Sequence, residues 1–130
     1  VYLKTEAESP CVYTRGTDIL YLPVRHGEGK FIPQSTAVIN QMERKNLCAL
    51  RYCKADGKPS MEYPANPNGS INSVAGICDE TGRLFGLMPH PEAYLSYINH
   101  PRWTRGNAPS ESQGLFIFRN AVNFIRSKDF

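Results

Sequence analysis

Two short apolar stretches joined by a turn sequence constrain the fold of this chain more than any other feature. The stretches are "NSVAGIC" (72–78) and "LFGLM" (84–88), and "DETGR" (79–83) lies between them. Aspartate accepts hydrogen bonds from nearby backbone amides, and glycine adopts backbone angles that other residues avoid, so the middle segment favours a turn. The sequence therefore predicts a β-hairpin over these residues.

Two further apolar segments enclose a helical pattern. "DILYLPV" (18–24) and "LCALRYC" (47–53) are short, apolar and bounded by turn residues, which is typical of buried strands. Between them, "IPQSTAVINQMERKN" (32–46) has Pro33 near its start, and Val38 and Met42 lie four residues apart on one helical face. The order strand, helix, strand favours an α/β domain built in layers.

The last part of the chain carries the clearest helical pattern. Five apolar residues repeat there at helical spacing: Leu115, Phe118, Ala121, Val122 and Ile125. Further apolar residues at positions 116, 117 and 124 widen the apolar surface beyond one stripe. We therefore expect this helix to be packed on more than one side.

Length, charge and cysteine spacing exclude several classes of protein. A chain of 130 residues fits one domain, and a net charge of +3 with scattered basic residues does not indicate a nucleic-acid partner. No apolar run approaches the roughly 18 residues of a membrane span. The start of the sequence has no signal-peptide core, and the four cysteines form no CxxC pair, so neither secretion nor a zinc site is indicated. We expect a cytoplasmic protein with no membrane contact.

The predicted hairpin leads directly into a histidine and a glutamate that flank a proline. Pro91 disfavours the helical region for His90, so the segment is expected to be extended, and side chains two residues apart then point to the same side. Glu92 can accept a hydrogen bond from one imidazole nitrogen of His90, which fixes the tautomer and stabilises the imidazolium. The spacing suits the base and the orienting acid of a nucleophilic triad. The alternative is a surface histidine beside a solvated glutamate.

Two other histidines test this interpretation within the same chain. His100 also precedes a proline, but the residue two positions later is Arg102, whose charge disfavours a protonated imidazole, so we expect a structural role. His26 and Glu28 are a closer rival, although the flanking glycines loosen that segment and favour close approach of the backbone to a ligand. A metal site shared by both His-x-Glu pairs is a weaker alternative, and the sequence as a whole indicates no metal.

A base of this kind needs a nucleophile, and the chain shows no suitable one. A nucleophilic Ser or Cys commonly sits on a Gly-x-Ser/Cys-x-Gly turn between a strand and a helix. Cys78 lies inside the first strand of the hairpin, and Cys11 follows a proline without flanking glycines. The catalytic set is therefore expected to be incomplete within this sequence.

Three segments carry a resemblance to a known family. "LPVRHGEGKF" (22–31), "YPANPNGSINSVAGICDETGRLFGLMPHPE" (63–92) and "FIFRNAVNFI" (116–125) resemble the C-terminal half of the glutaminase of phosphoribosylformylglycinamidine synthase, a class I glutamine amidotransferase. The resemblance implies the C-terminal portion of a flavodoxin-like α/β domain, with a sheet, flanking helices and a hairpin leading to the His-Pro-Glu segment. "INHPRW" (98–103) is similar to larger members in which glutaminase and synthetase are fused.

The resemblance also implies roles for particular residues. The family uses a cysteine, a histidine and a glutamate, and the last two fall on His90 and Glu92. The cysteine and the oxyanion hole belong to the N-terminal half of the domain, so this chain alone is expected to be inactive. The segments "HGEG" (26–29) and "YPANPNGS" (63–70) are expected to be substrate or interface loops, with plain turn structure as the alternative; their candidate residues are His26, Glu28, Tyr63, Asn66 and Asn68.

The same resemblance implies the substrate and the partners. Glutamine is the substrate, and the partners are the missing N-terminal half and a synthetase subunit or domain, on which ATP and Mg²⁺ act; no cofactor is expected on this chain. The alternative is a non-catalytic interaction half-domain that binds a synthetase. A half-sheet exposes an edge and apolar faces, so the isolated chain is expected to associate or to be poorly soluble.

Overall fold

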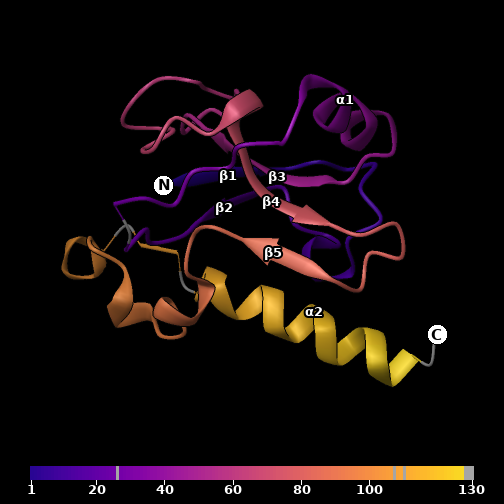
Figure 1. Ribbon diagram of the computed structural model, residues 1–130. Coiled ribbons are helices and arrows are strands. Elements are labelled where there is room, and N and C mark those ends of the chain that lie inside the picture. The colour runs from indigo at the N-terminus through magenta and orange to yellow at the C-terminus, as the bar shows by residue number, and fades with distance from the viewer. Residues whose placement is uncertain (26, 107, 110, 128–130) are drawn as a thin grey trace.

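The computed structural model describes residues 1–25, 27–106, 108–109 and 111–127, and its centre is a curled five-stranded sheet (Figure 1). The strands lie in the order β2-β1-β3-β4-β5, and each of the four pairings is antiparallel. The strands are β1 (Tyr2–Thr5), β2 (Ile19–Tyr21), β3 (Cys48–Cys53), β4 (Val74–Cys78) and β5 (Phe85–Leu87). The two α-helices are α1 (Thr36–Arg44) and α2 (Gln113–Ser127).

Five single-turn 3₁₀ helices complete the described elements. They are η1 (Val12–Thr14), η2 (Ile71–Ser73), η3 (Pro91–Ala93), η4 (Tyr97–Asn99) and η5 (Trp103–Arg105). Within the part of the chain that the structure describes, neither α-helix is long and apolar enough to cross a membrane.

The predicted hairpin is confirmed, and its turn uses the expected residues. Strands β4 and β5 pair antiparallel, and the carboxylate of Asp79 accepts hydrogen bonds from the backbone amides of Arg83 and Leu84 at 3.0 and 2.9 Å. Gly82 has a φ of +70°, and a Cβ there would lie 2.0 Å from the carbonyl oxygen of Pro10. Only glycine fits that position, both for its backbone angle and for its neighbour.

The predicted strand, helix, strand order is also confirmed as β2, α1 and β3. Helix α1 begins after Ser35, whose hydroxyl accepts a hydrogen bond from the amide of Val38, as a helix N-cap does. The side of α1 that faces the sheet carries Ile39 and Met42, whereas Val38 is 36% exposed. The sequence thus located the helix, but its buried face is turned slightly from the predicted one.

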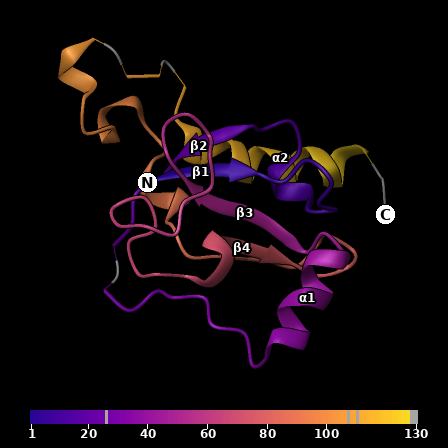
Figure 2. The ribbon, with the colours of Figure 1, turned by 90° about the horizontal axis from the view of Figure 1, so that it is seen from above.

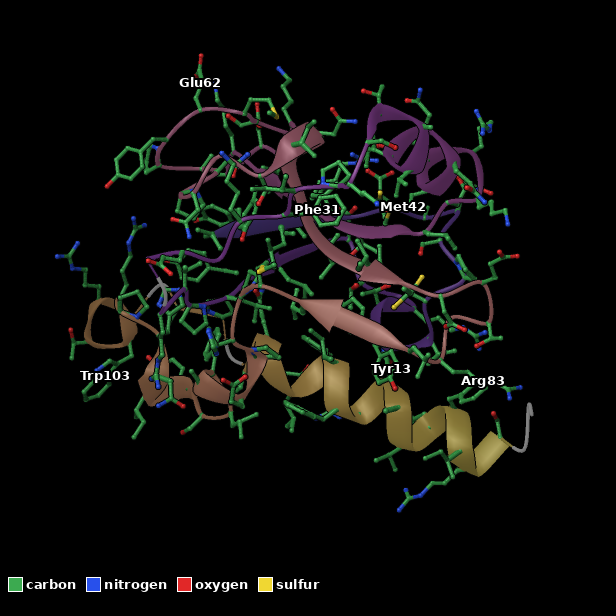
Figure 3. All side chains as sticks on the ribbon, in the orientation of Figure 1. Tyr13, Phe31, Met42, Glu62, Arg83 and Trp103 are labelled. Atoms are coloured by element: carbon green, nitrogen blue, oxygen red, sulfur yellow. The ribbon has the colours of Figure 1, made fainter. Side chains whose placement is uncertain are left out.

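The two α-helices cover opposite faces of the sheet, as the views in Figures 1 and 2 agree. Phe31 and Met42 lie on the side of α1, and Tyr13 and Arg83 on the side of α2 (Figure 3). The larger core lies on the α2 side; its buried members are Leu3, Leu20, Leu22, Leu50, Tyr52, Ala75, Tyr94 and Ile117. The layered arrangement of helices on a sheet is therefore present, with antiparallel strands throughout this portion.

Polar contacts fix helix α2 to β2 at its start and to η1 and the residue after η1 at its middle. The side chain of Gln113 accepts a hydrogen bond from the amide of Tyr21 on β2. The amide of Asn120 donates to the carbonyl oxygens of Tyr13 and Arg15 at 2.9 and 2.8 Å. These contacts set which side of α2 faces the core, and only Gly114 and Ile117 on that side are fully buried.

Candidate active site

His90 stands just beyond the end of β5, and backbone contacts hold it there. Buried Pro89 precedes it, and the amide of His90 donates to the carbonyl oxygen of Pro23 at 2.9 Å. The backbone of His90 is extended, with φ −109° and ψ 88°, as expected for a residue before proline. Immediately afterwards the chain forms the turn η3 instead of continuing extended, because the amides of Ala93 and Tyr94 bond back to His90 and Pro91.

His90 and Glu92 are brought together by this turn. The Nδ1 atom of His90 lies 2.7 Å from Oε1 of Glu92, and since an ionised carboxylate can only accept, Nδ1 is the donor. The predicted proximity of the two side chains is confirmed, whereas the extended geometry assumed to produce it is wrong beyond His90. The turn η3, not an extended segment, places the Glu92 carboxylate beside the His90 imidazole.

The electrostatics of Glu92 follow from this contact. The hydrogen bond from His90 is the main reason that the pKa of the Glu92 carboxyl lies below its usual range, and the charge of Arg25 acts weakly in the same direction. The side chains of His90 and Glu92 are 35% and 56% exposed, so solvent screens the pair. At neutral pH Glu92 is therefore a carboxylate that orients the imidazole.

The pair borders a cavity of about 360 Å³ on the α2 side of the sheet. Its walls are mainly apolar, apart from the pair and Tyr13; the lining residues are Tyr13, Phe85, Leu87, Pro89, His90, Pro91, Glu92, Ile117 and Phe118. The volume falls within the range of about 300–1,000 Å³ that small-molecule sites occupy. An imidazole held by a carboxylate at the edge of such a cavity can exchange protons with a group placed inside it.

None of the four cysteines, all of which the structure describes, lines this cavity. Each is buried, and burial raises the pKa of the Cys11 thiol above its usual value and that of both Cys48 and Cys53 to about 11. A thiol of this kind is a small apolar group and a poor nucleophile. That the nucleophile of this site lies outside this chain stays a prediction.

Of the two other histidines, the structure describes His100 but not His26. His100 is 8% exposed, its ring lies against Tyr21 and Tyr94, and its Nδ1 accepts from the amide of Arg102 at 3.0 Å. This packing is what a structural role requires. His26 lies outside the described residues, so its pairing with Glu28 and the metal site shared with it are not described; among the residues that are, no three His, Cys, Asp or Glu side chains form a metal-binding group.

The two predicted loops are fastened to each other. Asn68 donates to the carbonyl oxygen of Gly29 at 3.1 Å, and the hydroxyl of Ser70 accepts from the amide of Phe31 at 2.9 Å. Asn66 is 2% exposed, and its side-chain amide makes two hydrogen bonds to the backbone of Ser70. Asn68 and Ser70 thus join the two loops, whereas Asn66 stabilises the 63–70 loop from within.

The remaining loop candidates point elsewhere. The side chain of Tyr63 is 82% exposed and lines a separate cavity of about 560 Å³ beside β1 and β2. Glu28 is exposed, and its carbonyl oxygen accepts from the amide of Lys30. Neither residue lines the cavity of His90 and Glu92.

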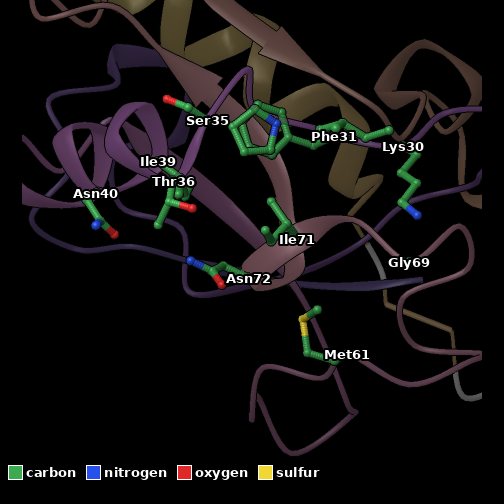
Figure 4. A pocket seen from close by; sticks show the side chains of 12 residues that line it. Lys30, Phe31, Ser35, Thr36, Ile39, Asn40, Met61, Gly69, Ile71 and Asn72 are labelled. Carbon is green, nitrogen blue, oxygen red and sulfur yellow. The ribbon is translucent and has the colours of Figure 1, made fainter.

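A larger cavity of about 620 Å³ lies between the loops and α1, on the opposite face of the sheet (Figure 4). Its walls include Phe31, Ile39, Met61 and Ile71, and Lys30 is the one ionisable side chain among its described lining residues. It holds no acid–base pair. Size alone would favour this cavity, but the chemistry favours the smaller one.

Three residues that shape the site were not predicted to belong to it, although Phe118 was named as part of the helical pattern. Pro23 supplies the carbonyl that holds His90, Gly114 lets α2 approach η3, and Phe118 closes one wall of the cavity. A glycine inside a helical pattern costs about 1 kcal/mol relative to alanine, so Gly114 was a detectable signal. The other two depend on tertiary contacts.

The comparison with known families identifies the class of protein. The chain belongs to the CobB/CobQ-like glutamine amidotransferase domain family, which it matches over residues 1–125. This confirms the class that the sequence resemblance indicated.

Within this family the chain is similar to PurQ subunits. It is 47% identical over 125 residues to phosphoribosylformylglycinamidine synthase subunit PurQ of Dehalococcoides mccartyi, covering 96% of this chain and 47% of that protein. It is 39% identical over 136 residues to the PurQ subunit of Methanococcus maripaludis strain C7, covering 96% of this chain and 49% of that protein. The chain thus spans about half the length of the curated relatives it matches.

A solved structure shares the fold. The structure of PurLQS from Thermotoga maritima matches 96% of this chain and 46% of the matched chain, with a TM-score of 0.60 and 23% sequence identity. The chain therefore resembles this structure in its fold.

Proposed function

We propose that this chain is the C-terminal part of the glutaminase of phosphoribosylformylglycinamidine synthase, within a complete domain of flavodoxin-like architecture. In this proposal the glutaminase hydrolyses glutamine and supplies ammonia for the ATP-dependent amidation of formylglycinamide ribonucleotide in de novo purine biosynthesis, in the cytoplasm. The observation that carries the proposal is the 2.7 Å contact between His90 and Glu92 at the edge of an apolar cavity. The similarity to PurQ subunits supports the choice of substrate.

The first half of the reaction requires a cysteine from the other half of the domain. The thiolate attacks the side-chain carbonyl carbon of glutamine, and the carbon–nitrogen bond then breaks to leave a thioester. His90 stabilises the thiolate as an imidazolium and passes its proton to the departing ammonia. Glu92 keeps the ring oriented through Nδ1 and offsets its positive charge.

The second half of the reaction regenerates the nucleophile. His90 takes a proton from water, the water oxygen attacks the thioester carbon, and the carbon–sulfur bond breaks, which releases glutamate and leaves the cysteine as a thiolate beside the protonated His90. The ammonia passes to the synthetase, which is the partner of the glutaminase. We assign ATP and Mg²⁺ to the synthetase and none to this chain.

The test is glutamate release from glutamine by this chain, alone and together with the half of the Dehalococcoides mccartyi subunit that lies outside the matched segment. We expect no turnover by the chain alone, because its cysteines are buried away from the cavity. We expect turnover by the pair, and its loss when His90→Gln replaces the wild-type chain. Glutamate release by the isolated chain, or by the pair that carries His90→Gln, would contradict the proposal.

A second candidate is a non-catalytic interaction half-domain that binds a synthetase. The absence of a cysteine from the described lining of the cavity favours it. A complex of both halves that binds a synthetase and releases no glutamate would select this candidate.

A further inference from the structure

Two arginines from distant parts of the chain meet over one aromatic ring of α2. Arg15 follows η1, and Arg83 ends the turn of the β4–β5 hairpin beside the C-terminal half of α2 (Figure 3). Their Cζ atoms lie 5.4 and 5.7 Å from the ring centroid of Phe124. A cation within about 6 Å of the centroid is attracted to the face of an aromatic ring. We refer to Arg15, Arg83 and Phe124 as the arginine cluster.

Hydrogen bonds fix the backbone at both arginines. The side-chain amide of Asn120, one helical turn before Phe124, donates to the carbonyl oxygen of Arg15 at 2.8 Å. The Tyr13 hydroxyl donates to the carbonyl oxygen of Arg83, also at 2.8 Å. Because the backbone is already held at both positions, less conformational freedom is lost when the two guanidinium groups bind a partner.

Neither guanidinium group is neutralised by a described residue. Both side chains are exposed, and no carboxylate in the described ranges forms an ion pair with either of them. Arg51 shows the contrast, since it forms ion pairs with both Glu6 and Glu43. Two positive charges beside one ring repel each other, so carboxylates placed against them are attracted by both.

A purely structural role is the alternative. Cations favour the C-terminal end of a helix through its macrodipole, and Phe124 lies in the last turn of α2. In such a role the guanidinium groups would donate to the last carbonyl oxygens of the helix. The described hydrogen bonds of Arg15 and Arg83 involve only their backbone atoms, so both forks of donors remain available to a partner.

The shape of this surface favours a protein partner over a small ligand. Small molecules bind in concave sites, and no cavity among the described residues is lined by a member of the arginine cluster. Two arginines are also fewer than the roughly four to eight basic residues that bind an anionic membrane. Arginine is enriched at protein interfaces, where its planar fork binds a carboxylate through two parallel hydrogen bonds.

We propose that Arg15 and Arg83, held over Phe124, form a docking point for an acidic segment of a partner protein, with each guanidinium group binding one carboxylate. The inference goes beyond the proposed function and does not depend on it. No residue of the arginine cluster lines the cavity of His90 and Glu92.

The experiment is titration of the chain with hexa-aspartate, a peptide with blocked ends, at low ionic strength. The side-chain N–H signals of Arg15 and Arg83 in NMR spectra should shift and saturate together. Arg15→Gln and Arg83→Gln should each weaken binding roughly threefold, as the loss of one exposed ion pair does, and the double variant should weaken it roughly tenfold. A peptide of alternating serine and glycine should not bind.

Arg44→Gln is the charge-matched control. Arg44 is an exposed arginine in the last turn of α1, on the opposite face of the sheet (Figure 2). Its replacement lowers the net charge by the same amount and should leave the affinity for hexa-aspartate unchanged. The unfolding midpoint of each variant is measured in parallel. If a glutamine variant fails to fold, the lysine variant at the same position replaces it, because lysine keeps the charge and loses the fork.

Four results would overturn the proposal. The first is a wild-type chain that does not bind hexa-aspartate, and the second is an equal loss of affinity on Arg44→Gln. The third is inorganic phosphate that binds as tightly as the peptide, which would indicate a site for a small oxyanion. The fourth is a lower unfolding midpoint of the Arg15 and Arg83 variants with unchanged affinity, which would indicate a structural role. None of these measurements involves glutamine turnover, so the proposed function stands or fails separately.

Discussion

Gly114, in the first turn of α2, lies directly against the backbone of Pro91. A Cβ atom on Gly114 would come within 2.0 Å of the carbonyl oxygen of Pro91 and 2.6 Å of that of Tyr94. Both neighbours are backbone atoms, which cannot rotate away as a side chain can. The start of α2 thus rests against the turn that carries Glu92, and the closeness depends on the missing side chain of residue 114.

Replacing Gly114 should therefore disturb the His90–Glu92 pair. Gly114→Ala forces η3 and α2 apart, which should cost about 1–3 kcal/mol of stability as other overpacked substitutions do. The Glu92 carboxylate then loses part of its hydrogen bond from His90, so its depressed pKa should rise towards the ordinary value of about 4.3. A titration of the Glu92 carboxyl carbon by NMR measures this shift.

Gly86→Ala is the matched control for this prediction. Gly86 lies in β5, close to the same site, but a Cβ there would meet only Ile77, at 3.6 Å. It should leave the titration of Glu92 unchanged. A Gly114→Ala chain whose Glu92 titrates as in the wild type would show that the close approach does not position the pair.

Local chemistry explains which parts of the fold could be predicted from the sequence. Asp79 and Gly82 specify the hairpin turn by themselves, through hydrogen bonds and a positive φ that need no distant partner. Pro91 fixes the backbone of His90 in the same way, and Ser35 caps α1. Each of these features depends on residues within a few positions of one another.

The features that were missed depend on distant contacts. The sequence predicted the order strand, helix, strand but not the pairing: β1 lies between β2 and β3, and only long-range contacts decide that. The sequence predicts Asn66 as a loop residue available to a substrate or partner. In the structure its side-chain amide is instead hydrogen-bonded to the backbone of Ser70. Leu115, Phe118, Val122 and Ile125 of α2 have the spacing of a buried face, yet each is at least 37% exposed, which periodicity alone does not reveal.

The hairpin turn should make the stability of the chain sensitive to acid. Hydrogen bonds to the carboxylate of Asp79, first from the Thr81 hydroxyl and then from the amide of Leu84, lower its pKa to about 2. A carboxyl with a lower pKa in the folded state adds stability above its unfolded pKa of about 3.9, and this is lost as the pH falls towards the folded value. The urea midpoint should therefore fall between pH 4.5 and pH 2.

Asp79→Asn should reduce that acid dependence, because an amide does not titrate. Glu8→Gln, at an exposed position, is the control and should retain it. If the pH profile of Asp79→Asn matched the wild type over this range, the turn would not be the source of the effect.

Two tyrosine hydroxyls in the core are expected to reduce stability. The hydroxyls of Tyr52 and Tyr94 are buried and have no hydrogen-bond partner among the described residues, and burial raises the pKa of Tyr52 to about 12. A buried hydroxyl without a partner costs desolvation free energy. Tyr52→Phe should therefore be neutral or stabilise the chain by up to about 1 kcal/mol in chemical denaturation.

Tyr13→Phe provides the contrast for this pair. The hydroxyl of Tyr13 donates to the carbonyl oxygen of Arg83 at 2.8 Å, so its removal should cost about 0.5–1.5 kcal/mol. A loss on Tyr52→Phe as large as that on Tyr13→Phe would mean that the Tyr52 hydroxyl has a partner after all.

The carboxylate of Glu92 should matter for turnover and little for glutamine binding. In the two-half enzyme, Glu92→Gln leaves a side chain that can still meet Nδ1 of His90 but carries no charge to stabilise the imidazolium. Since a positioned acid–base group contributes about 10²–10⁴-fold, we expect kcat to fall by one to two powers of ten, less than for His90→Gln, with KM nearly unchanged. Glu111→Gln, which removes an exposed carboxylate of the segment before α2, should keep both constants. A Glu92→Gln enzyme with wild-type kcat, or one that loses affinity for glutamine instead of turnover, would remove Glu92 from the catalytic set and leave its contact with His90 a purely structural one.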